Sequence, residues 1–175
     1  FGYGRRGNVV TTAGEHAAVA SAVAELKNRG VEVRFAPLNG DGSVNAEALL
    51  SLVDDKTSLV SVIHVNNETG AINDVNDLAK AVKAKSPRAL FHSDGVQAYG
   101  KIPFRLGREI DLYAVSAHKI GALKGTGALI RKKSLSVRPY IFGGGQEGGE
   151  RSGTENVFGI MVFVYAAEEK FRTLK

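Results

Sequence analysis

Residues 58–65 read SLVSVIHV, a nearly continuous run of β-branched and other apolar residues. Such a run predicts a strand that is buried on both faces of a sheet. The next segment, Asp77–Lys85, has a helical pattern, and Pro87 separates it from a short strand at Ala89–Ser93. This strand–helix–strand order is typical of an α/β fold.

The same alternation extends in both directions along the chain. Further strands are expected at Asn8–Thr12, Val31–Ala36, Ile110–Ser116 and Gly125–Ile130, and further helices at Glu15–Arg29, Asn45–Val53 and Asn156–Lys170. Asn45 is expected to cap its helix, and the last helix is expected to be amphipathic or buried. The sequence therefore predicts a mixed, mostly parallel sheet with helices on both faces.

The composition of the 175 residues favours one globular domain, since 43% are hydrophobic and 23% are charged. No apolar run approaches the roughly 18 residues that a membrane span needs. The chain contains no cysteine, which excludes disulfides and thiolate metal sites within it, and no metal-ligand spacing occurs. We therefore expect no metal site, no membrane partner and a cytoplasmic protein.

The net charge is +5, but the 23 lysine and arginine residues are scattered rather than clustered. Direct binding to nucleic acid is therefore not expected, whereas an anionic small molecule fits the charge equally well. An alternative stays open in which the excess of basic residues binds tRNA, and it predicts that tRNA binding weakens as the salt concentration rises. The chain begins at Phe1, and Met161 is its only methionine, so we expect an internal fragment.

Two glycine-containing stretches imitate phosphate-binding motifs without their structural context. Gly2, Gly4 and Gly7 have the spacing of a dinucleotide fingerprint, but no strand precedes them and a strand follows, so a loop is predicted. Residues 121–127 contain Lys124 without the spacing of a P-loop. Neither NAD nor a nucleoside triphosphate is supported.

Polar residues follow four of the expected strands. His16 follows the first strand, residues 66–68 (Asn-Asn-Glu) the third, Asp94 the fourth, and residues 116–119 (Ser-Ala-His-Lys) the fifth. Each residue alone has an ordinary explanation as a turn, a helix cap or a solvated side chain. Because parallel sheets bind ligands at the carboxyl ends of their strands, their convergence predicts a small-molecule site.

Five ordered motifs resemble the cysteine desulfurases of the NifS and IscS type, in the class V aminotransferase family. The motifs are residues 64–70 (HVNNETG), residues 93–97 (SDGVQ), His118-Lys119, residues 143–147 (GGGQE) and residues 151–154 (RSGT), and the short pair Glu15-His16 also matches. The resemblance runs from about Val9 to the end of the chain. It implies the aspartate aminotransferase-like fold (fold type I) of pyridoxal-phosphate (PLP) enzymes. Residues 1–175 would form the central part of the large domain, without the N-terminal segment and the C-terminal small domain.

The resemblance also assigns roles around the PLP cofactor. It implies that Lys119 holds PLP as a Schiff base and later moves the substrate's Cα proton. Asp94 would pair with the pyridinium nitrogen, and Gln97 would hydrogen-bond the phenolic oxygen. Asn67 would reach the same side of the cofactor or the substrate carboxylate. His16 would stack on the ring and transfer protons.

Three further residues would hold the cofactor phosphate. The resemblance implies that Ser116 and His118 bind it directly, and that Thr154 reaches the phosphate of the neighbouring subunit in a homodimer. His64 and His92 lie inside strand runs, so we expect them to be structural histidines with hydrogen-bond partners.

The implied activity converts L-cysteine to L-alanine and passes sulfur to an enzyme cysteine as a persulfide. A sulfur-acceptor scaffold for iron–sulfur clusters or a tRNA-thiolation protein would receive it. This chain contains no such cysteine, so it is not expected to complete the transfer alone. It also carries Ala122-Leu123 where the family commonly has Gly-Pro, and Gly148 where an arginine is usual. Selenocysteine lyase and a non-catalytic, partner-binding scaffold therefore remain alternatives.

Overall fold

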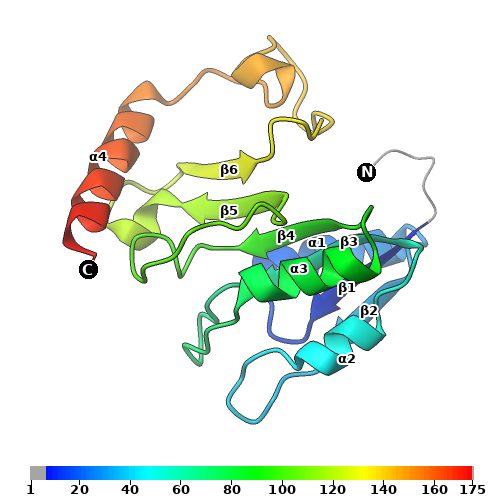
Figure 1. The fold of residues 1–175 in the computed structure, drawn as a ribbon. Coiled ribbons are helices and arrows are strands. Elements are labelled where there is room, and N and C mark those ends of the chain that lie inside the picture. Colours follow the sequence, from blue (N-terminus) through cyan, green and yellow to red (C-terminus); the bar gives the residue numbers. More distant parts are fainter. Residues whose placement is uncertain (1–6, 175) are drawn as a thin grey trace.

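The computed structural model describes residues 7–174, so Gly2 and Gly4 of the predicted N-terminal loop lie outside the described residues. A single six-stranded sheet runs through the molecule in the order β2-β1-β3-β4-β5-β6 (Figure 1). Its strands are β1 (Asn8–Thr12), β2 (Val33–Ala36), β3 (Thr57–Ile63), β4 (Leu90–Asp94), β5 (Leu112–Ser116) and β6 (Gly127–Arg131). All neighbouring pairs are parallel except β5 and β6, which confirms the mixed, mostly parallel sheet.

Helices cover both faces of this sheet, as predicted. The structure contains α1 (Ala17–Asn28), α2 (Ala46–Ser51), α3 (Val75–Lys85), α4 (Val157–Thr173) and the short 3-10 helices η1 (Ala117–Ile120) and η2 (Glu147–Gly149). In Figure 1, α2 and α3 lie in front of the sheet and α1 lies behind it. None of the described helices is long and apolar enough to cross a membrane.

Side-chain caps fix the starts of the helices. The predicted cap Asn45 accepts a hydrogen bond from Ala48 N at 2.9 Å. Asp74 accepts one from Asp77 N at 3.0 Å, so α3 begins at Val75, two residues before the predicted start. The expectation of a helix at Asn156–Lys170 is also confirmed, since Asn156 caps α4 through Gly159 N at 3.0 Å.

The hydrophobic core lies between the sheet and the helices α2 and α3. Strand β3 is buried along almost its whole length, as its β-branched sequence predicts. Phe91 of β4, Leu49 of α2 and Val82 of α3 are completely shielded from solvent in this layer. Helix α1 contributes much less, because Val23 is its only buried residue among those described.

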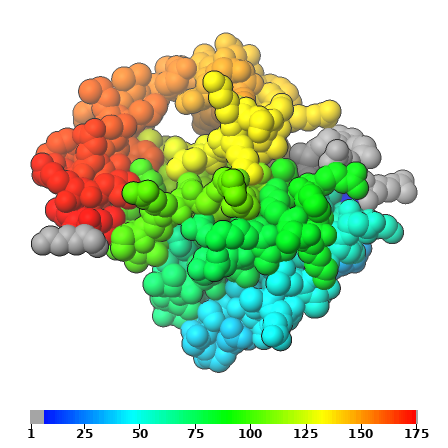
Figure 2. All heavy atoms as spheres, viewed as in Figure 1, coloured from blue at the N-terminus to red at the C-terminus, as the bar shows by residue number. Residues whose placement is uncertain are grey.

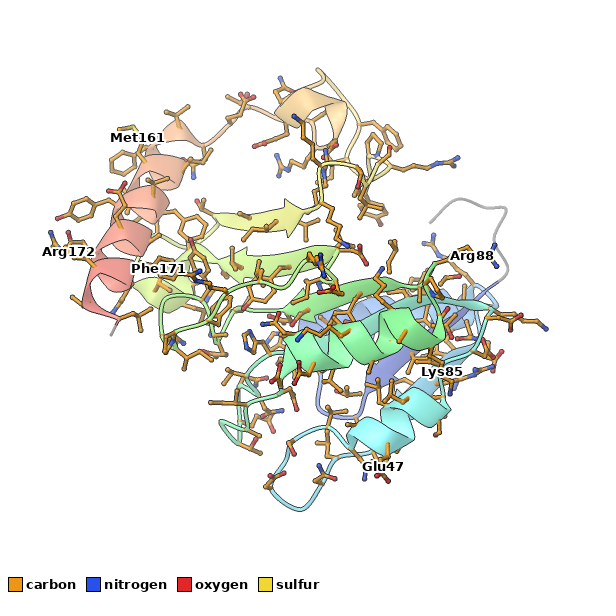
Figure 3. All side chains as sticks on the ribbon, viewed as in Figure 1. Glu47, Lys85, Arg88, Met161, Phe171 and Arg172 are labelled. Carbon is orange, nitrogen blue, oxygen red and sulfur yellow. The ribbon has the colours of Figure 1, made fainter. Side chains whose placement is uncertain are left out.

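The C-terminal part of the chain is less well covered. Helix α4 stands at the carboxyl ends of β4 and β5 and buries only Gly159 and Phe163 (Figure 1). Phe171 of α4 points toward the sheet and packs edge-on against Tyr99, whereas Met161 points outward and is 66% exposed (Figure 3). The alternative of a fully buried helix is therefore wrong for the described residues, because few parts of the chain pack on its outer face.

One buried carboxylate links the parallel strands and α3 to the C-terminal part of the chain. Asp111, just before β5, accepts hydrogen bonds from Lys83 of α3 at 2.5 Å and from Phe91 N at 2.7 Å. Its other oxygen accepts from Lys132, directly after β6, at 2.7 Å. Burial alone would raise the pKa of Asp111, but these donors outweigh that effect and hold the pKa below its usual range.

Candidate active site

A cavity of about 300 Å³ opens at the carboxyl ends of the parallel strands. This volume lies at the lower end of the range for small-molecule sites. The residues that line it come from the ends of β3, β4 and β5 and from the start of α1: His16, Ala18, Ile63, Asn67, Asp94, Val96, Gln97, Ser116, His118 and Lys119. Seven of the eight side chains predicted from the sequence therefore meet in one place, and the exception is Thr154.

Asp94 is the last residue of β4 and the one carboxylate that lines the cavity among the described residues. It is buried, and its Oδ1 accepts a hydrogen bond from Val96 N at 3.0 Å. The next residue, Gly95, lies against the ring of Tyr113, where an added Cβ would be 1.9 Å from a ring carbon. The absence of a side chain at position 95 therefore leaves room for the Tyr113 ring beside Asp94.

Gln97 lies one short turn beyond Asp94 and receives a hydrogen bond from Lys101 on its Oε1. Because lysine can only donate, this contact directs the amide NH₂ of Gln97 to other acceptors. The positive charge of Lys119 lies near enough to Lys101 to lower its pKa, although burial of Lys101 is the larger cause.

Lys119 and its neighbours lie on η1, directly after β5. Ser116 Oγ and His118 Nδ1 are 3.0 Å apart, so these two predicted phosphate ligands already contact each other. Gly121 ends the short helix with a φ of 93°, a left-handed conformation that glycine adopts without strain. This sharp reversal keeps the amine-bearing residue at the mouth of the cavity.

His16 and Asn67 approach from the other side of the cavity. His16 caps α1, since its Nδ1 accepts from Ala18 N at 3.1 Å, and in a neutral ring the proton therefore resides on Nε2. The neighbouring Asn66 is structural: it donates to Gly14 O at 2.9 Å and accepts from two backbone amides of its own turn. This leaves Asn67, which is exposed, as the amide that lines the cavity.

Thr154 does not line this cavity. It is exposed in the segment that connects β6 to α4, and Figure 2 shows this segment arching out from the body of the molecule toward α4. Its predicted contact with the phosphate of a neighbouring subunit involves a second chain. That role stays a prediction.

The sequence prediction missed Glu15, the residue directly before His16. Its Oε1 accepts hydrogen bonds from Thr12 Oγ1 and from Ile63 N, both at 2.8 Å. Burial, with a smaller contribution from the charge of Asp94, raises the pKa of Glu15 to about 7, although both hydrogen bonds oppose the shift. Its place beside His16 was visible in the sequence, but its burial was not.

The two strand histidines have structural partners, as predicted. His64 Nδ1 lies 2.8 Å from Tyr113 Oη, and His92 Nδ1 lies 2.8 Å from Ser61 Oγ. Burial lowers the pKa of both rings, so each tends to stay neutral. Across residues 7–174, no group of three or more histidine and carboxylate side chains could hold a metal ion.

The arrangement has the chemistry that PLP requires. A lysine amine can attach the cofactor covalently, and a buried carboxylate can pair with a ring nitrogen. The Ser116 hydroxyl and the His118 imidazole, which also line the cavity, can form hydrogen bonds with a phosphate. An open α/β sheet with these groups at its strand ends defines a fold-type-I enzyme of the PLP-dependent class.

Comparison with known proteins confirms this classification. The profile of the family "Aminotransferase class-V" matches residues 3–169, and the chain belongs to this PLP-dependent family. A cysteine desulfurase of Cereibacter sphaeroides is 44% identical over 165 residues, which are 93% of this chain and 42% of the relative. "Cysteine desulfurase IscS" of Rickettsia typhi is 40% identical over 99% of this chain and 43% of the relative.

Solved structures show the same fold. A "NifS-like protein" superimposes with a TM-score of 0.94 at 42% identity, covering 97% of this chain and 47% of that one. "SspA in complex with cysteine" superimposes with a TM-score of 0.86 at 30% identity, covering 93% of this chain and 47% of that one. The predicted resemblance to the NifS and IscS type is thus confirmed. The chain spans less than half the length of these relatives.

Proposed function

We propose that the protein is a PLP-dependent cysteine desulfurase that converts L-cysteine to L-alanine and an enzyme-bound persulfide. The observation that carries this proposal is the meeting of Lys119, Asp94, Gln97 and His16 in one cavity, although they come from separate segments of the chain. The names of the relatives and the cysteine complex of SspA support the substrate.

Each cavity residue has a defined task in this proposal. The bound cofactor supplies an electron sink for cleavage at the substrate's Cα. Lys119 would attach the cofactor and move the Cα proton, while Asp94 would provide a negative charge for the ring nitrogen. Gln97 donates from its amide, since Lys101 occupies its carbonyl oxygen. His16 would donate or accept a proton through Nε2, since its Nδ1 accepts from Ala18 N.

Asn67, Ser116 and His118 orient the cofactor and the substrate. Asn67 offers an amide to the ring oxygen or to the substrate carboxylate. The contact between Ser116 and His118 supports a shared task at the phosphate, because the two side chains lie 3.0 Å apart and both line the cavity. Thr154 would complete the phosphate site of the partner subunit.

We further infer that residues 1–175 are the central part of the PLP-binding large domain. The chain aligns with 40 to 43% of the length of three curated relatives, namely the two named above and the cysteine desulfurase of Trichormus azollae. The nucleophilic cysteine would then lie in sequence outside this chain. A cytoplasmic homodimer that delivers sulfur to a scaffold or tRNA-thiolation protein fits this assignment.

The substitution Lys119→Ala tests the proposal most directly, in the protein with any native flanking sequence. Addition of PLP to the wild type should give a visible absorbance band that survives gel filtration, and L-cysteine should yield alanine. The variant should lose both the retained band and alanine formation, by about a thousandfold or more for the reaction.

Lys133→Ala is the matched control, because Lys133 is an exposed lysine in the turn after β6 and does not line the cavity. It should retain the band and the activity. A wild type with no retained band would favour the non-catalytic scaffold. A band unchanged by Lys119→Ala would refute the cofactor assignment, and exclusive turnover of selenocysteine would favour the lyase.

A further inference from the structure

Glu15 connects two strand ends beneath the cavity. A single carboxyl oxygen, Oε1, accepts hydrogen bonds from Thr12 at the end of β1 and from the backbone N–H of Ile63 at the end of β3. Ile63 itself lines the cavity, and His16 directly follows Glu15. Oε1 of Glu15 therefore holds the turn that carries His16 against Ile63, which lines the cavity.

The other oxygen of Glu15 is in an unusual position. Oε2 is buried and has no hydrogen-bond partner among the described residues. A charged oxygen without a donor is strongly unfavourable in such a place, because it has lost its hydration without compensation. The carboxylate of Asp94 is close enough to disfavour a second negative charge. Both effects favour a proton on Oε2.

We propose that Glu15 is a positioning residue of the cofactor site that works as a neutral carboxylic acid. This inference rests on the proposed PLP function. In the neutral form, Oε1 still accepts from Thr12 and Ile63, so the His16 turn stays in place. A neutral Glu15 adds no second negative charge beside Asp94, the one carboxylate that lines the cavity among the described residues.

The pH dependence of unfolding tests the neutral state without any cofactor. Among the groups around the Glu15 carboxyl, Asp94 of β4 carries the interacting charge, His16 is the next residue, and Thr12 and Ile63 are uncharged. Because the folded pKa is raised from 4.5 to about 7, the stabilisation is complete below pH 4.5 and is lost as the pH rises to about 7.

Glu15→Gln keeps an oxygen acceptor and an N–H donor but cannot ionise. Its stability relative to the wild type should therefore increase steadily as the pH rises from about 5 to about 8. Its affinity for PLP should stay within about threefold of the wild type, whereas Glu15→Ala should weaken binding about tenfold or more by freeing the His16 turn. Equilibrium dialysis against PLP measures this difference.

Two results would overturn the proposal: a stability difference between Glu15→Gln and the wild type that does not change with pH, or a Gln variant that binds PLP as weakly as the Ala variant.

If Glu15→Gln does not fold, Thr12→Val provides a second route. It removes the hydroxyl donor to Oε1 and should move the titration to higher pH, while Thr12→Ser should leave it unchanged. An unmoved titration in Thr12→Val contradicts the proposal. None of these pH measurements depends on Lys119 or on the cofactor, so failure of the PLP assignment would be recognised separately.

Discussion

The parallel part of the sheet, residues 8–116 with α2 and α3, contrasts with the C-terminal part, residues 127–173. In the first part, apolar side chains lie in the core, and β3 is covered on both faces. In the second part, many large apolar side chains are exposed: Leu129, Ile130, Tyr140, Ile141, Phe142, Val157, Phe158, Met161, Val164 and Tyr165. Among the large apolar side chains of the parallel part, Phe35 and Ile72 are exposed and most others are buried, whereas the C-terminal part presents a surface that a further chain segment or subunit can cover.

Phe91→Ala should have the largest effect on folding. The side chain of Phe91 is completely buried in the core between the sheet and the helices α2 and α3, so its removal leaves a cavity there. The free energy of unfolding should fall by about 3–5 kcal/mol. Denaturant unfolding of the purified protein measures this loss, and a loss below about 1 kcal/mol would contradict the described core.

Asp111→Asn should have a somewhat smaller effect and would weaken the link between the two parts. The asparagine retains one acceptor oxygen, but Lys83 and Lys132 would face each other without the negative charge between them. We expect a loss of about 3 kcal/mol in unfolding free energy. Asp77→Asn is the matched control, since Asp77 forms an exposed pair with Lys80 and should lose at most about 0.5 kcal/mol. Equal losses in both variants would show that Asp111 does not join the parts.

Phe158→Ala should have the smallest effect on folding and instead affect assembly. Phe158 is 72% exposed on α4, so it makes little contact within the described chain. If the proposed homodimer covers α4, the substitution should weaken self-association by about tenfold, while the midpoint of core unfolding stays near that of the wild type. Analytical ultracentrifugation over a concentration series measures the association. An unchanged dissociation constant would place the subunit interface elsewhere.

Most of the parallel part could be predicted from the sequence, because local patterns and tertiary packing agree there. The β-branched run of β3, the cap at Asn45 and the polar residues after each strand all act over short distances. The meeting of His16, Asp94 and Lys119 could also be predicted, because parallel strands bring their carboxyl ends to one edge of the sheet.

The features that were missed depend on contacts between distant residues. The carboxyl group of Glu15 accepts from the amide of Ile63, which lies 48 positions away in the sequence, and its other oxygen is buried. Asp111 is paired by lysines from two other elements. The alternative of a buried α4 was wrong for another reason: its apolar pattern is typical of a covered helix, but it buries only Gly159 and Phe163 within the described residues.

The contact between Gly95 and Tyr113 limits how this site can change during evolution. Any side chain at position 95 would displace the Tyr113 ring and with it the hydrogen bond to His64. A substitution at position 95, next to Asp94, would therefore disturb the packing on the far side of the sheet, where His64 also packs against Phe104. New substrate preferences in this scaffold would arise more readily at the rim, at Asn67 or Gln97, than at the floor. The tyrosine ring thus makes the anchoring acid one of the least adjustable parts of the molecule.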